Sequence, residues 1–196
     1  MQAHDLDPTM VRRLRRAEYD RLVVAGAFGD ERLELIDGVI VRRSPRGTRH
    51  ATIVRRLNKA FTLAVGDRAE VQIQLPLALD DTSEPEPDLS IVPVGQYLDA
   101  HPTTAWLVVE VSESSARYDL RVKAALYARA AIPELWVIDL GARVVHVHRE
   151  PRPDGTWATV TRVGPGEALV PTAIDRVAID SADLLPPPAE IQPRQS

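Results

Sequence analysis

The chain has 196 residues, of which 44% are hydrophobic and 27% charged, and a net charge of -4 at neutral pH. This length allows one well-buried domain, and the absence of cysteine excludes a disulfide framework, a thiolate metal site and a cysteine nucleophile. The net acidity argues against a general nucleic-acid coat protein, although the first third of the chain is basic. No apolar stretch is long enough to span a membrane and no apolar signal core is visible, so we expect a cytoplasmic protein.

The N-terminal part predicts a helix followed by a β-hairpin. Apolar residues fall near helical spacing over residues 9–25, and Gly26 ends the pattern. Residues 32–36 and 39–42 then flank Asp37-Gly38, a pair that favours the type I′ turn of a two-residue hairpin.

A second helix and a long strand are expected next. Thr48 can cap a helix over residues 49–65, whose apolar side chains form one stripe. Alternating apolar residues predict a half-exposed strand over residues 70–79, bent at Pro76. The polar residues 80–87 are interpreted as a solvated loop.

The centre of the sheet is expected in the middle of the chain. Residues 88–92 and 105–112 are short apolar runs typical of strands that are buried on both faces. A helix is predicted over residues 117–131, and Ile132-Pro133 ends it. Three more strands are predicted over residues 134–139, 144–149 and 156–162.

These elements predict an α/β fold in which a mixed central sheet is flanked by helices. We expect residues 1–185 to form a single domain. The proline-rich residues 186–196 lack a packing pattern and are interpreted as a disordered tail.

Glu110 is the most informative charged residue, because it interrupts the apolar run of residues 105–112. A carboxylate buried there without a cation costs several kcal/mol. Side chains alternate along a strand, so Glu110 can face Asp88 if their strands are neighbours. Two carboxylates together with water and phosphate oxygens suit Mg²⁺, for which Mn²⁺ can substitute.

Lys123 lies at the border of the buried stripe of the helix over residues 117–131, which directs its ammonium inward. Such a cation needs an anion, either Glu110 or a bound phosphate. Two plainer interpretations stay open. Lys123 can form a structural ion pair with Glu110, or it can extend its charged end into water.

Four sequence segments resemble the Uma family of restriction endonucleases (Uma-two type): Glu34-Leu-Ile-Asp-Gly38, Glu84-Pro-Glu-Pro-Asp88, Val109-Glu-Val-Ser112 and Lys123 through Asp139. This family belongs to the PD-(D/E)xK superfamily, so the resemblance implies a restriction-endonuclease-like core and a magnesium-dependent phosphodiesterase site. By this resemblance Asp88 and Glu110 are the catalytic acids and the metal ligands. Ser112 occupies the place of the motif lysine. Lys123 resembles the lysine that some relatives supply from the next helix in place of the motif lysine.

Several other residues are candidates for auxiliary roles. Glu34 can bring a further acid to the metal pocket or stay in solvent, and His50 can contact phosphate or be a surface side chain. Four arginines can follow a phosphate backbone or form a solvated helix face: Arg46, Arg49, Arg55 and Arg56. His146 and His148 share one strand face, and cross-strand packing explains them better than a metal.

The sequence therefore predicts a Mg²⁺-dependent endonuclease that cuts DNA with Asp88, Glu110 and Lys123 and acts as a homodimer. The alternative is a non-catalytic module, nucleic-acid-binding or regulatory, that retains the nuclease scaffold, because Ser112 replaces the motif lysine. A glycosidase with paired carboxylates is the weakest alternative, because the chain has few aromatic residues for a sugar platform.

Overall fold

A six-stranded mixed sheet forms the centre of the protein. The computed structural model describes residues 10–44, 46–175, 177–185 and 187. The strand order is β3-β4-β5-β6-β7-β8, and every neighbouring pair is antiparallel except β5 and β6. The bounds are β3 (Ala69–Gln72), β4 (Leu89–Pro93), β5 (Leu107–Ser112), β6 (Glu134–Asp139), β7 (Val144–Pro151) and β8 (Trp157–Val163). The expected α/β fold with a mixed central sheet is confirmed.

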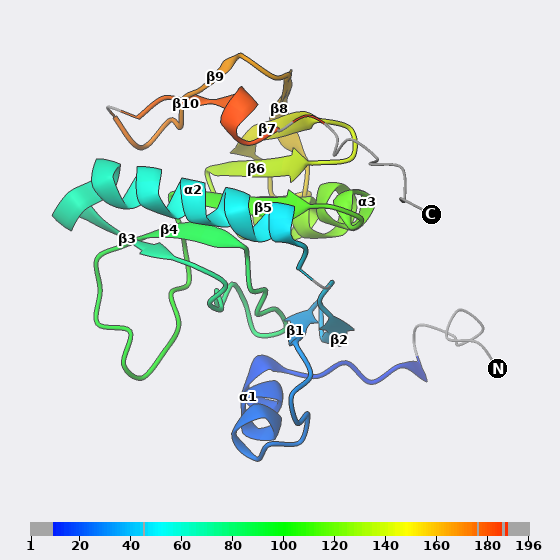
Figure 1. Cartoon of the computed structure of the whole chain (residues 1–196). Helices are drawn as coiled ribbons and strands as arrows, with labels where there is room; N and C mark the ends of the chain where they lie inside the picture. Colours follow the sequence, from blue (N-terminus) through cyan, green and yellow to red (C-terminus); the bar gives the residue numbers. More distant parts are fainter. Residues whose placement is uncertain (1–9, 45, 176, 186, 188–196) are drawn as a thin grey trace, which may run out of the picture.

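Helices cover both faces of this sheet. The long helix α2 (Thr48–Val65) lies across one face (Figure 1) and buries Ile53, Leu57 and Phe61, which are spaced by four residues. The other face packs against the helical segment that includes Ala124 and Tyr127. Alternation along β5 therefore directs its odd-numbered residues toward α2 and its even-numbered ones toward the second helical layer.

The second helical layer has a π-helical turn in the middle. It consists of α3 (Ala116–Tyr118), the π turn η4 (Asp119–Lys123) and α4 (Ala124–Arg129). The amide of Ala124 donates to the carbonyl oxygen of Asp119, five residues earlier, which widens the helix at this point. The helix expected over residues 117–131 is therefore present but interrupted, and π turns are frequent at functional sites.

The N-terminal elements lie beside the main sheet (Figure 1). They are α1 (Arg16–Val24) and the antiparallel hairpin of β1 (Leu33–Ile36) and β2 (Val39–Arg42). The hairpin prediction is confirmed, whereas α1 is shorter than expected. Arg15 has an extended backbone and the amide of Leu14 donates to Gly38, so this segment binds the hairpin before the helix starts.

Three local predictions were wrong. The strand expected over residues 70–79 stops at Gln72, because Gln74 has a positive φ of 54° and Pro76 cannot donate a ladder hydrogen bond. The segment expected to be a solvated loop buries Glu84, whose amide donates to Leu35 at 2.7 Å. Thr48 is the first residue of α2 rather than its cap; Gly47 occupies the cap position.

The C-terminal part contains elements that the sequence did not predict. The two-residue strands β9 (Ala168–Leu169) and β10 (Ile179–Asp180) pair with each other and precede the short 3₁₀ helix η5 (Ser181–Asp183). Another 3₁₀ helix, η3 (Gly66–Arg68), follows α2. Apart from Pro187, the tail expected at 186–196 lies outside the described residues. In the part of the chain that the structure describes, no helix is long and apolar enough to cross a membrane.

His148 packs against Trp157. The two rings meet edge to face, with their centroids 5.5 Å apart, and His148 is buried. Burial lowers the pKa of His148 to about 4, so its ring is neutral at neutral pH. The preference for cross-strand packing is confirmed for this histidine.

Candidate active site

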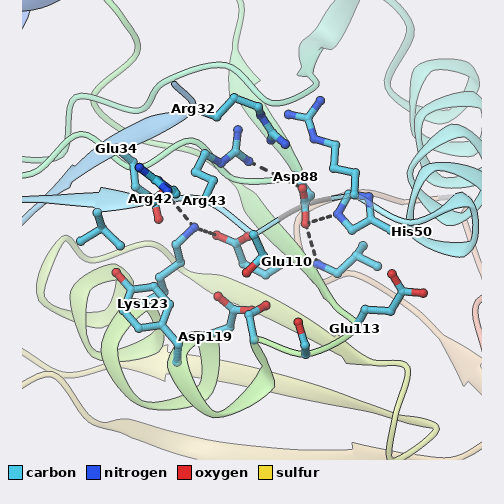
Figure 2. Close-up of a pocket in the computed structure, with 17 residues that line it drawn as sticks. Arg32, Glu34, Arg42, Arg43, His50, Asp88, Glu110, Glu113, Asp119 and Lys123 are labelled. Atoms are coloured by element: carbon cyan, nitrogen blue, oxygen red, sulfur yellow. Dashed lines mark hydrogen bonds and ion pairs between the residues drawn. The ribbon is translucent and has the colours of Figure 1, made fainter. Parts of the chain in front are cut away.

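The predicted acids and lysine line one pocket of about 290 Å³. Figure 2 shows Asp88, Glu110 and Lys123 together in this pocket. Asp88 comes from the residue before β4, Glu110 from β5, and Lys123 from the last position of the π turn η4. The hairpin of β1 and β2 and the first turn of α2 supply other parts of the wall.

Sheet register explains why Asp88 and Glu110 meet. Leu89 pairs with Val109 in the antiparallel ladder of β4 and β5, so one further step along it places Asp88 opposite Glu110. Directly opposed residues point to the same face of a sheet, with their β-carbons about 5 Å apart. Two carboxylates distant in sequence thus become neighbours.

Asp88 is held by four neighbours. Its Oδ2 accepts a hydrogen bond from the amide of Val111 at 2.9 Å and lies 2.9 Å from Nε2 of His50. Its Oδ1 accepts from Gln74 at 3.1 Å and lies 3.7 Å from Arg43. Burial alone would raise the pKa of Asp88, but the contacts with His50, Val111 and Gln74 outweigh it and lower the pKa below its usual value. Asp88 is therefore an oriented, ionised carboxylate.

Glu110 is in the opposite electrostatic situation. It is 3% exposed, and its Oε1 accepts hydrogen bonds from Lys123 at 3.1 Å and from the Tyr127 hydroxyl at 2.7 Å. Burial raises the pKa of Glu110 to about 8, the ammonium of Lys123 opposes this, and the charges of Asp119 and Asp88 add to it. A nearby divalent cation would favour the ionised form.

Lys123 joins two acids from different parts of the fold. Its Nζ lies 3.0 Å from Oε2 of Glu34 in β1 and 3.1 Å from Oε1 of Glu110 in β5. Burial opposes the charge of Lys123, but the charges of Glu110 and Glu34 outweigh burial and raise its pKa above the usual value. The lysine is 4% exposed and stays protonated. This contradicts the interpretation in which its charged end extends into water.

Ser112 is buried beside the pocket and positions an acid. Its hydroxyl donates to Oδ2 of Asp119 at 2.5 Å, and Ser115 donates to the same oxygen at 2.7 Å. Burial raises the pKa of Asp119, and the charge of Lys123 and the two serine hydroxyls counteract it. Asp119 thereby faces the pocket as an additional acid.

The predicted auxiliary residues divide into two groups. Glu34, His50 and Arg46 line the pocket. The other three predicted arginines are not among the lining residues: Arg49 donates to the carbonyl of Pro187, Arg55 to the Thr52 hydroxyl, and Arg56 to the carbonyl of Asp183.

The sequence reasoning missed several residues of the pocket. Asp119 was overlooked because an acid in a predicted helix resembles a solvated charge, although two serines precede it. Arg32 and Arg43 flank the hairpin and line the pocket. Tyr127 falls on the apolar face of the predicted helix, where only its hydroxyl indicates a polar partner.

The acids of the pocket suit a magnesium ion. Among the described residues, no three histidine or acidic side chains form a ready-made metal cluster. Mg²⁺ does not require one, because it keeps several waters and takes one or two carboxylates plus phosphate oxygens. Asp88 and Glu110 line the same pocket, and Oε2 of Glu110 accepts no hydrogen bond from the described residues. This donor set fits a two-carboxylate magnesium site.

A mixed sheet that carries two opposed acids, with a lysine from the next helical layer, defines a restriction-endonuclease-like α/β protein. The chain belongs to the Uma2 family, described as "Putative restriction endonuclease", whose sequence model matches residues 16–180. The fold is similar to the crystal structure of "a putative nuclease belonging to DUF820 from Anabaena variabilis ATCC 29413". The TM-score is 0.66 at 17% identity, over 79% of this chain and 90% of that chain. No curated protein matches the chain.

Proposed function

We propose that this protein is a metal-dependent endonuclease that hydrolyses phosphodiester bonds of DNA. The observation that carries the proposal is the meeting of Asp88, Glu110 and Lys123 in one pocket. Phosphodiester hydrolysis needs an activated water and a cationic environment for the charge that develops on phosphorus. The description of the Uma2 family supports the same class of reaction.

The carboxylates of Asp88 and Glu110 would hold Mg²⁺, or Mn²⁺ in its place. The bound cation supplies a lower pKa for the attacking water and neutralises phosphate charge. Asp88 contributes a fixed orientation, because the Val111 amide and His50 hold one of its oxygens. This preorganisation means that the acid does not have to reorient when substrate arrives.

Lys123 contributes a fixed positive charge on the other side of Glu110. Its ammonium stays protonated between Glu34 and Glu110, so it can donate to a phosphate oxygen or orient a water without changing its own charge. Glu34 and the π turn determine where this ammonium lies, because the π turn ends at Lys123. The migrated lysine therefore reaches the acid that the motif lysine would serve.

DNA is the proposed substrate, and a homodimer is the proposed assembly. A single pocket cuts one strand, whereas a twofold dimer presents two identical sites to the two antiparallel strands of a duplex. Cleavage of both strands by a dimer would appear as linear plasmid without a long-lived nicked product.

The second candidate is a non-catalytic module on the same scaffold. It is favoured by one observation: Lys123 pairs with both Glu110 and Glu34, so the buried acids have a cation without any metal. The two candidates differ in metal dependence. A scaffold stabilised only by this ion pair gains nothing from Mg²⁺.

A substrate survey tests the proposal. Purified protein is incubated with supercoiled, linear and single-stranded DNA in Mg²⁺, in Mn²⁺ and in a chelator. We expect cleavage with metal that the chelator abolishes, and loss of cleavage in Asp88→Asn. Intact DNA under every metal condition would favour the non-catalytic module.

A further inference from the structure

The arginines around the pocket are not equivalent. Arg42 pairs with Glu31, and Arg43 pairs with Glu86 at 2.5 Å and lies 3.7 Å from Asp88. Arg32 and Arg46 line the same pocket, yet neither side chain has a hydrogen bond or ion pair with any residue that the structure describes. Two guanidinium groups at the pocket therefore have no hydrogen-bond or ion-pair partner among the described residues.

Other positive charges act on both of these arginines. Burial lowers the pKa of Arg32 and the like charge of Arg43 adds to that effect, while the charges of Glu86, Asp88 and Glu34 oppose it without cancelling it. Burial likewise lowers the pKa of Arg46, the charges of Arg32 and Arg43 add to this, and those of Asp88 and Glu86 oppose it without cancelling it. The nearby carboxylates offset this repulsion only in part, so a further anion at the two guanidinium groups would be favourable. The arrangement favours a ligand with strong negative charge.

The position of the pair indicates which anion it is. Figure 2 shows Arg32 across the pocket from Asp119, and Asp88 is near enough for its charge to act on the pKa of Arg32. The reacting phosphate would lie between the acids and Lys123, so an anion at Arg32 is a different group. Guanidinium groups bind phosphate through paired hydrogen bonds of fixed geometry.

We propose that Arg32 and Arg46 form a phosphate clamp that holds the phosphodiester group next to the one that is cut. This inference rests on the proposed function for the identity of the strand. It assigns substrate positioning to the start of the hairpin and to the segment just before α2, and not to the exposed face of α2 that carries Arg55. Phosphate contacts of this kind fix the register of a strand without reading its sequence.

DNA affinity without metal tests the clamp separately from cleavage. Fluorescence anisotropy is measured in a chelator with a short duplex that lacks terminal phosphates, over a series of salt concentrations. The variants are Arg32→Gln, Arg46→Gln and their double. Arg55→Gln is the matched control, because Arg55 is an exposed arginine whose guanidinium contacts only Thr52 among the described residues.

We expect each pocket variant to weaken binding about tenfold, as the loss of one charged hydrogen-bonded contact predicts. The slope of log affinity against log salt should fall by about 0.9 for each arginine, and the Arg55 control should bind like the wild type. Thermal unfolding should show pocket variants at least as stable as wild type, because a like-charge repulsion is removed. Arg32→Lys, which keeps the charge and loses the paired geometry, should bind with intermediate affinity.

The clamp is wrong if the double variant binds within twofold of the wild type, if Arg55→Gln loses as much affinity, or if the wild type does not bind the duplex. Cleavage decides the separate question. If the wild type cuts DNA and the double variant binds DNA as well as the wild type does, the nuclease proposal is supported and the clamp is contradicted. If the protein never cuts DNA but the double variant loses affinity, Arg32 and Arg46 remain a phosphate-binding site and the nuclease is removed.

Discussion

The ammonium of Lys123 lies 3.1 Å from Oε1 of Glu110, and both side chains are almost completely buried. One comes from a π turn and the other from a central strand, so the contact joins two layers of the fold. A buried ion pair contributes little stability compared with apolar packing, but removing one partner leaves an uncompensated charge. The contact is therefore sensitive to any change of either residue.

At pH 9, above the pKa of Glu110, Lys123→Gln should destabilise the metal-free protein by about 3 kcal/mol, because Glu110 and Glu34 would lose their cation. Urea unfolding in a chelator measures this change. The loss should be smaller when Glu34→Gln is already present, since one of the two acids is then neutral. A loss below about 1 kcal/mol in the single variant would show that the pair is not electrostatically important.

Metal binding should release a proton near neutral pH. The pKa of Glu110 is about 8 in the metal-free protein, so most of this carboxyl is protonated at pH 7 and must ionise to become a ligand. Calorimetry of Mn²⁺ binding in two buffers of different ionisation enthalpy measures the released proton. Affinity should rise with pH up to about 8 and then level. Binding without proton release at pH 7 would contradict the role of Glu110.

Because the carboxyl of Glu84 is buried, we expect the free energy of unfolding to fall as the pH rises. Burial raises the pKa of this carboxyl to about 7, and Arg16, 3.9 Å away, compensates only partly. The pKa of Glu84 is higher in the folded than in the unfolded state, so its contribution to the free energy of unfolding is fully present below pH 4.5. This contribution is lost as the pH rises through 7. Glu84→Gln should therefore stabilise the protein at pH 8 by on the order of 2 kcal/mol. Thermal unfolding at pH 5 and pH 8 tests this, with little difference expected at pH 5.

The end of α4 provides a prediction about the backbone. Ala131 has a φ of 56°, and the amide of Ile132 donates back to Tyr127 at 3.0 Å, which closes the helix. A left-handed conformation costs an alanine roughly 1 kcal/mol compared with glycine. Ala131→Gly should therefore raise the free energy of unfolding by about 0.5–1 kcal/mol. Destabilisation in urea would show that the turn has a different conformation in solution.

Much of the fold was predictable because local patterns and tertiary packing agree. Asp37-Gly38 specified the hairpin, and the apolar stripe of α2 and the apolar run of β5 fixed their burial. Glu110 stood out because a charge inside such a run needs a partner, and the structure supplies Lys123 and Tyr127. Strand alternation then predicted the face that this acid shares with Asp88.

The remainder depended on contacts that no local pattern contains. The strand beyond Gln72 ended because of a positive φ at Gln74, which the apolar alternation did not indicate. The π turn, which gives Asp119 and Lys123 their places in the pocket, has no residue signature in a helix pattern. Similarly, Arg32 and Arg46 reach the pocket through the docking of the hairpin, which is a long-range arrangement.

The central claim is that Glu110 is a ligand of a divalent cation used to cut DNA. The most direct measurement is the initial rate of supercoiled plasmid cleavage in Mg²⁺ by wild type, Glu110→Gln and the matched control Glu70→Gln. Glu70 is a strand glutamate outside the pocket, whose carboxylate accepts from the amide of Gly95. We predict a loss of at least about 100-fold for Glu110→Gln and a wild-type rate for Glu70→Gln. Equal rates for all three proteins would contradict the account.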